Sequence, residues 1–155
     1  RLDLATRAFV AKHRAGTAPA EGIAVTPDGR EVWVGLREEG VVRVLDGATG
    51  APLATLPGFA VPDRIGMSPD GRRAVITDWI CETVHVADVP ARRLLGPVGG
   101  LAGAGAARIL PDGRTVLVAM LEEGGVALAD LESRRTLAYH TLGRRVDAAA
   151  WGPEP

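Results

Sequence analysis

A proline recurs along this chain at a fixed interval of 42 residues. It stands at Pro27, Pro69, Pro111 and Pro153. An aspartate keeps the same interval, at Asp46, Asp88 and Asp130. A repeat of about 40 residues indicates that one structural unit is copied along the chain, and this constrains the fold more than any local pattern does. The fold therefore depends first on what one 42-residue unit builds.

Each unit contains four short runs of β-forming residues with turn residues between them. A Pro-Asp-Gly turn joins the first run to the second, and Asp-Gly supplies the positive φ that a tight hairpin needs. No helical periodicity is present in the sequence. Four short strands per unit predict an all-β fold, a β-propeller built of four-stranded antiparallel blades. An up-and-down barrel is the alternative, but a barrel does not require so regular a repeat.

The repeat also divides the chain into parts. Whole blades are expected at residues 17–58, 59–100 and 101–145. Residues 1–16 resemble the end of the third unit and are expected to form the outer strand of a preceding blade, while residues 146–155 are expected to form the inner strand of a following one. The chain is thus expected to be a partial propeller. We interpret it as a fragment of a seven-bladed ring of roughly 300 residues, or as a unit that another polypeptide completes.

Composition excludes several classes of partner. The apolar share of 46% is typical of a globular domain, and the net charge of −1 gives no reason to expect nucleic acid or an anionic membrane as partner. The sequence has no run of 18 apolar residues, so no membrane span is predicted. The single cysteine, Cys81, excludes an internal disulfide.

Two stretches, residues 40–58 and 61–72, resemble the YVTN-type β-propeller repeat. In that family a strand ending in Asp is followed by a Thr-Gly turn, and the next inner strand runs into Ser-Pro-Asp-Gly-Arg. The resemblance extends over nearly the whole chain and is weakest in the third unit, which lacks the Thr-Gly turn. The family groups bacterial and archaeal propellers that are mostly exported, so it implies a periplasmic or extracellular location. Lactonases of the seven-bladed kind and periplasmic dehydrogenase-associated subunits are similar in outline.

The loops between second and third strands indicate where a ligand would bind. In this strand order they lie around the channel mouth, on the face opposite the Pro-Asp-Gly turns, and this loop face is the default ligand surface. The middle loop, residues 78–82, carries Trp-Ile-Cys where its counterparts carry Arg-Glu-Glu and Leu-Glu-Glu. We predict that Trp79, flanked by Asp78 and Glu82, contacts a partner or apolar ligand. The alternative is that Trp79 and Ile80 fold back onto the adjacent blade.

Acidic residues begin three of the inner strands. Glu21, Asp63 and Asp147 occupy equivalent positions, and their convergence near the channel mouth would raise some of their pKa values. Arg64 and Arg108 could neutralise them instead, and a turn-stabilising role is the alternative for Asp63. Because the acids lie on different blades without a histidine partner, no catalytic set, metal site or cofactor is predicted. The three histidines are expected at the surface.

These patterns predict a non-catalytic binding or interaction module whose loop face contacts a protein partner or a small ligand. The alternative is a fragment of a propeller enzyme, either a lactonase-like hydrolase or a periplasmic dehydrogenase-associated subunit, with its active site completed by other blades. A divalent ion at the inner-strand acids would favour the enzyme. An exposed patch at Trp79 would favour the binding module.

Overall fold

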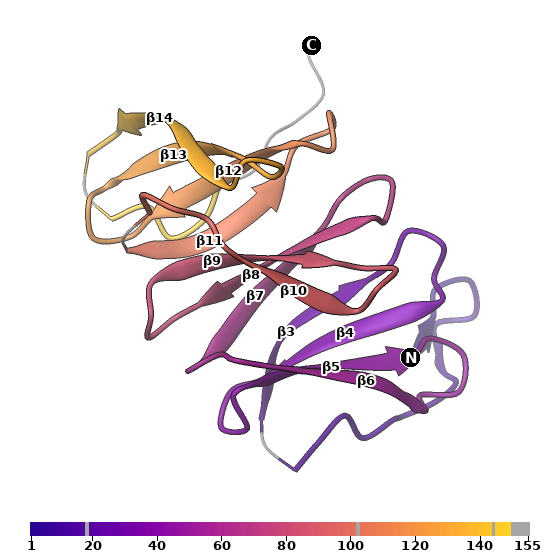
Figure 1. Cartoon of the computed structure of the whole chain (residues 1–155). Helices are drawn as coiled ribbons and strands as arrows, with labels where there is room; N and C mark the ends of the chain where they lie inside the picture. The colour runs from indigo at the N-terminus through magenta and orange to yellow at the C-terminus, as the bar shows by residue number, and fades with distance from the viewer. Residues whose placement is uncertain (18, 102, 144, 150–155) are drawn as a thin grey trace.

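A computed structural model describes residues 1–17, 19–101, 103–143 and 145–149, and these ranges contain strands and turns without a helix (Figure 1). The chain begins with a small antiparallel hairpin of β1 (Leu2–Asp3) and β2 (Ala8–Phe9). Three four-stranded sheets then follow one another along the chain.

The three sheets have the same plan. The first blade contains β3 (Ala20–Val25), β4 (Glu31–Leu36), β5 (Val41–Asp46) and β6 (Pro52–Pro57). The second contains β7 (Pro62–Met67), β8 (Arg73–Asp78), β9 (Thr83–Asp88) and β10 (Arg93–Pro97). The third contains β11 (Ala104–Ile109), β12 (Thr115–Met120), β13 (Gly125–Asp130) and β14 (Arg135–Thr141). In every sheet the strands pair antiparallel in chain order, so the predicted all-β fold of four-stranded antiparallel blades is confirmed.

The blades stack face to face (Figure 1). Apolar side chains form the clusters between them. Successive side chains of a strand point to opposite faces, so a middle blade is buried on both sides. On β8, Ile76 joins the cluster shared with Trp33 of the first blade, while its neighbour Val75 joins the cluster shared with Val118 of the third. The inner strands β3, β7 and β11 contact one another in that order.

Turn chemistry explains both repeated sequence signals. At each Pro-Asp-Gly turn the glycine has positive φ: 72° at Gly29, 69° at Gly71 and 68° at Gly113. Asp28 fixes the first of these turns by accepting hydrogen bonds from the Thr26 hydroxyl at 2.6 Å and from the Arg30 amide at 3.0 Å. The 42-residue spacing of proline therefore marks one hairpin turn per blade.

The repeating aspartate ends the third strand and caps the turn that follows. Its carboxylate accepts the amide hydrogen three residues later, at 2.7 Å in Asp46, 3.1 Å in Asp88 and 2.7 Å in Asp130. Asp3 makes the same contact at 2.8 Å, so strand β1 ends on a turn-capping aspartate as the third strands of the blades do. These aspartates stabilise turns.

The two ends of the chain are less regular than the blades. In residues 1–16, expected as the outer strand of a preceding blade, only Leu2–Asp3 and Ala8–Phe9 are in strand conformation among the described residues, and these two short strands pair with each other. Residues 145–149 contain no strand, and residues 150–155 lie outside the described part of the chain. No helix among the described residues is long and apolar enough to cross a membrane.

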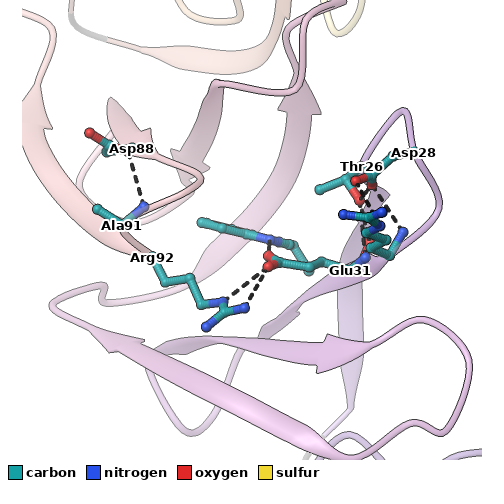
Figure 2. Close-up of polar contacts among 8 residues, drawn as sticks. Thr26, Asp28, Glu31, Asp88, Ala91 and Arg92 are labelled. Carbon is teal, nitrogen blue, oxygen red and sulfur yellow. Dashed lines mark hydrogen bonds and ion pairs between the residues drawn. The ribbon is translucent and has the colours of Figure 1, made fainter.

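Arginine side chains connect the second blade to the first and the third blade to the second. Arg92, on the turn before β10, donates from Nε and Nη2 to Glu31 Oε1 at 3.0 and 2.8 Å (Figure 2). In the third blade, Arg134 donates to the Leu95 carbonyl oxygen of the second. Both arginines have positive φ, 47° and 53°, and stand where the first blade has Gly50. The left-handed turn position therefore carries an inter-blade contact in two blades.

A double-mutant cycle on Arg92→Met and Glu31→Gln should give a coupling free energy of about 1 kcal/mol, because Arg92 donates two charged hydrogen bonds to one oxygen of Glu31 and the pair is partly shielded from solvent. Urea unfolding of the two single variants and the double variant measures it. Arg93→Met provides the control, since the Arg93 side chain is exposed and lies 4.0 Å from Asp88 within the same blade. Additive losses for Arg92 and Glu31 would show that the contact does not hold the blades together.

Candidate functional site

A pocket of 260 Å³ lies between the second and third blades on the loop face. Its lining comes from the β8–β9 loop, the β12–β13 loop and the chain segments near them: Trp79, Ile80, Glu82, Gly103, Ala104, Leu121, Glu122 and Arg145. Trp79 is 42% exposed and Ile80 65% exposed. The alternative in which these two side chains fold away against the next blade is therefore not observed.

The connection between the second and third blades joins the two loops. The Ala104 amide donates to the Glu82 carbonyl oxygen at 3.4 Å, and the Leu121 amide donates to the Gly103 carbonyl oxygen at 2.8 Å. Residues 103 and 104 thus bridge the loop that carries Trp79 and the loop that carries Glu122. The pocket has a shape set by main-chain contacts on both sides.

Asp78 fixes the base of the Trp79 loop. It has no exposed surface, and its oxygens accept the amide hydrogens of Ala60 at 2.7 Å, Val61 at 3.0 Å and Cys81 at 3.3 Å. Burial tends to raise the pKa of this carboxyl, but the backbone donors, Val61 foremost, hold its pKa below the ordinary value. Asp78 was predicted to contact a ligand, and its burial gives it a positioning role instead.

Glu82 adopts a backbone conformation that favours glycine. Its φ is 52°, and the equivalent residues of the other blades are Gly40 with φ 64° and Gly124 with φ 68°. A side chain in the left-handed region costs about 1–2 kcal/mol. Strain of this kind, kept beside a pocket, motivates a functional hypothesis for Glu82. Alignment of the three loops identifies this position from the sequence alone.

Glu82→Gly should raise the free energy of unfolding by about 0.5–1 kcal/mol, because the relief of left-handed strain exceeds the greater entropy of glycine in the unfolded chain. Chemical denaturation measures the change. Glu82→Ala is the matched control, since alanine removes the carboxylate but keeps a Cβ at positive φ. Equal stabilities of the glycine and alanine variants would contradict the assignment of strain.

The structure brings together two of the three inner-strand acids, Glu21 and Asp63. Burial is the main cause that raises the pKa of Asp63; the Arg64 guanidinium at 3.3 Å opposes it, and the Glu21 charge adds to it. Glu21 also forms an ion pair with Arg37 at 2.5 Å. Sequence reasoning missed Arg37, although the β3–β4 hairpin, in which Ala20 pairs with Leu36, places it next to Glu21.

The other predicted residues of this group do not join it. Arg108 is exposed and donates to the Ala107 carbonyl oxygen at 3.2 Å, and no described acid forms an ion pair with it. Asp147 lies near the third blade, with its carbonyl oxygen 3.6 Å from the position of a Cβ at Gly105. Within the described ranges no group of three histidine, cysteine or acidic residues could hold a metal ion.

His85 was predicted at the surface, and the structure places it partly buried. Its ring packs edge-on against Phe59 with centroids 5.0 Å apart, and Nε2 lies 3.2 Å from the Thr83 hydroxyl. Burial lowers the pKa of His85, while the Asp78 carboxylate partly opposes this effect. The variable position on the third strand therefore packs against the inter-blade connection, and its partial burial favours the neutral form of this imidazole.

Three stacked four-stranded blades with a loop-face pocket define a β-propeller module. The sequence matches no family model, and no curated protein matches it. Among solved structures, the chain is similar to the hydrazine synthase of Kuenenia stuttgartiensis, with a TM-score of 0.82 and 24% identity over 91% of this chain. The match spans only 42% of that solved chain. A likeness at this identity shows the fold, and a propeller fold hosts many activities.

Proposed function

We propose that this β-propeller module is a non-catalytic binding scaffold of the YVTN type, exported to the periplasm or the cell exterior, that presents its loop face to a protein partner. The observation that carries the proposal is the exposed Trp79–Ile80 pair beside a pocket. Asp78 fixes the loop beneath them through three backbone amides. An apolar anchor that is already ordered binds with less loss of conformational entropy than a flexible one.

The proposal is tested by selecting a phage-displayed peptide library on the chain, with counter-selection on a Trp79→Ala, Ile80→Ala variant. We expect peptides whose binding depends on Trp79 and survives Leu137→Ala. Leu137 is 63% exposed on the third blade, so this control removes a comparable apolar surface away from the pocket. Selection that yields no Trp79-dependent peptide would refute the binding role of this face.

The face of the first blade that points away from the second blade carries exposed apolar side chains, and we propose a further blade as its partner. Ile23 and Val25 on β3 are 66% and 51% exposed, whereas the equivalents of Ile23 in the next two blades, Ile65 and Ala107, are buried. Ile65 is buried against the first blade, and Ala107 is buried against the second. Because the same strand positions are apolar in all three units, we propose that a further four-stranded blade covers the outer face of the first.

In a solution of the isolated chain, only a second copy can supply that blade. Light scattering after size exclusion should therefore give a mass above that of one chain. Ile23→Lys should restore the mass of one chain, because a charge on this face opposes burial. A single-chain mass for both proteins would argue against an apolar face that recruits a blade.

A further inference from the structure

The size of the Trp79 pocket limits what it can hold. Its 260 Å³ is below the roughly 300–1,000 Å³ of pockets that enclose a drug-sized ligand. The pocket also lies between two loops rather than inside a blade. These dimensions suit one side chain of a protein partner better than a whole small-molecule ligand.

Two carboxylates from different blades line this pocket. Glu82 comes from the second blade and Glu122 from the third. Within the part of the chain that the structure describes, neither makes a hydrogen bond or ion pair with its carboxylate. On the first blade, Glu21 pairs with Arg37 and Glu39 pairs with Arg43, whereas Glu38, the counterpart of Glu122, makes no such contact in the described part of the chain. Negative charge without a partner is thus found at the pocket, where a cation would complement it.

The apolar part of the lining suits the stem of a long cationic side chain. The Trp79 ring can accept a cation over its face, and Ile80 and Leu121 offer apolar contact to methylene groups. Glu82 keeps its carboxylate here in a left-handed conformation that the other two blades reserve for glycine. An aromatic face, apolar contacts and two carboxylates together match an alkyl chain that ends in a positive charge.

We infer that this pocket accepts a lysine or arginine side chain of a protein partner, an inference that rests on the proposed binding function. Arg145 also lines the pocket and is the one charge there that opposes such a guest. With two glutamates and one arginine, the lining keeps a net negative charge. Neutralising Arg145 should therefore strengthen binding of a cation, whereas it would weaken binding of an anion.

The probes are single amino acids blocked at both main-chain ends: Nα-acetyl-lysine N-methylamide, whose side-chain amine is free and charged, its uncharged norleucine analogue and its glutamate analogue. Titrations follow the NMR signal of the Trp79 indole N–H, assigned by its loss in Trp79→Phe. We expect the lysine probe to shift this signal saturably and the other two to leave it unmoved. Glu82→Gln and Glu122→Gln should each weaken lysine binding roughly three- to tenfold, and Arg145→Gln should strengthen it.

The matched control is Glu38→Gln, which removes a glutamate at the position equivalent to Glu122 on the loop of the first blade. It should leave the affinity for lysine unchanged. If norleucine binds as tightly as lysine, or if glutamate binds more tightly, the inference that the guest is a cationic side chain is overturned. The proposal that the Trp79 face binds a partner is not affected by that result. If no probe shifts the Trp79 signal, the inference is overturned as well. Peptide selection then decides separately whether the Trp79 face binds any partner.

Discussion

Asp78→Ala is expected to lower the free energy of unfolding by about 2–4 kcal/mol, because it leaves three backbone amides without their charged acceptor. The carboxylate is fully buried and accepts from Ala60, Val61 and Cys81. Two of these donors belong to the connection between the first and second blades, so the loss should also release the Trp79 loop. Urea unfolding measures the stability. The affinity of the Trp79-dependent peptides shows whether the Trp79 loop keeps its conformation.

Asp78→Asn separates the charge from the shape of this side chain. The variant keeps one carbonyl acceptor, so its loss should be smaller than that of alanine. The pKa of Asp78 is lower in the folded state than in the unfolded chain. The stability that its charge provides is therefore present above the ordinary pKa of about 3.9 and is lost as the pH falls through the folded value. The difference between the protein and the asparagine variant should shrink only in acid.

Asp28→Asn is the matched control, because Asp28 also accepts backbone and hydroxyl hydrogens but lies in an exposed turn. Its effect should be much smaller than that of Asp78→Asn. Equal losses at the two positions would mean that burial of Asp78 adds nothing to the hydrogen bonds. A loss at Asp78 that persists unchanged at low pH would contradict the lowered pKa.

The fold could be predicted because its signal is local and repeated. Each Pro-Asp-Gly turn needs positive φ at glycine, and each third strand ends on an aspartate that caps the following turn. Turn residues of this kind act over three or four positions, so they can be identified without tertiary information. The recurrence every 42 residues then sets the size of the blade and the number of its strands.

The site could be predicted only in part, because its contacts join distant segments. The exposure of Trp79 agrees with the departure of its loop from the other two. The role of Asp78 could not be predicted, since its donors Ala60 and Val61 lie 18 and 17 residues away on an inter-blade connection. The Arg92–Glu31 contact spans 61 residues and depends on how two blades stack. Repeat patterns determine the blade, whereas packing between blades determines these partners.

Trp33→Ala is expected to lower the free energy of unfolding by about 3–5 kcal/mol, the range for removing a fully buried aromatic side chain. Trp33 has no exposed surface and lies in the cluster between the first and second blades with Ile65 and Ile76. Its equivalents in the other blades are the smaller Val75 and Leu117. The neighbouring core side chains can shift only partly into the space that the indole leaves, so alanine should leave a cavity at the interface between the first and second blades. Urea unfolding measures the loss.

Trp33→Phe shows which contact of the indole matters most. The Nε1 hydrogen donates to Glu31 Oε2 at 3.0 Å, and the other oxygen of Glu31 accepts from Arg92. Phenylalanine keeps most of the apolar contact but removes this donor, so its loss should be about 1 kcal/mol if packing dominates. A loss close to that of alanine would instead mean that the indole acts by holding Glu31 in place for Arg92. In that case Trp33→Phe should also abolish the coupling between Arg92 and Glu31, so that one side chain links the apolar core to the polar contact between the blades.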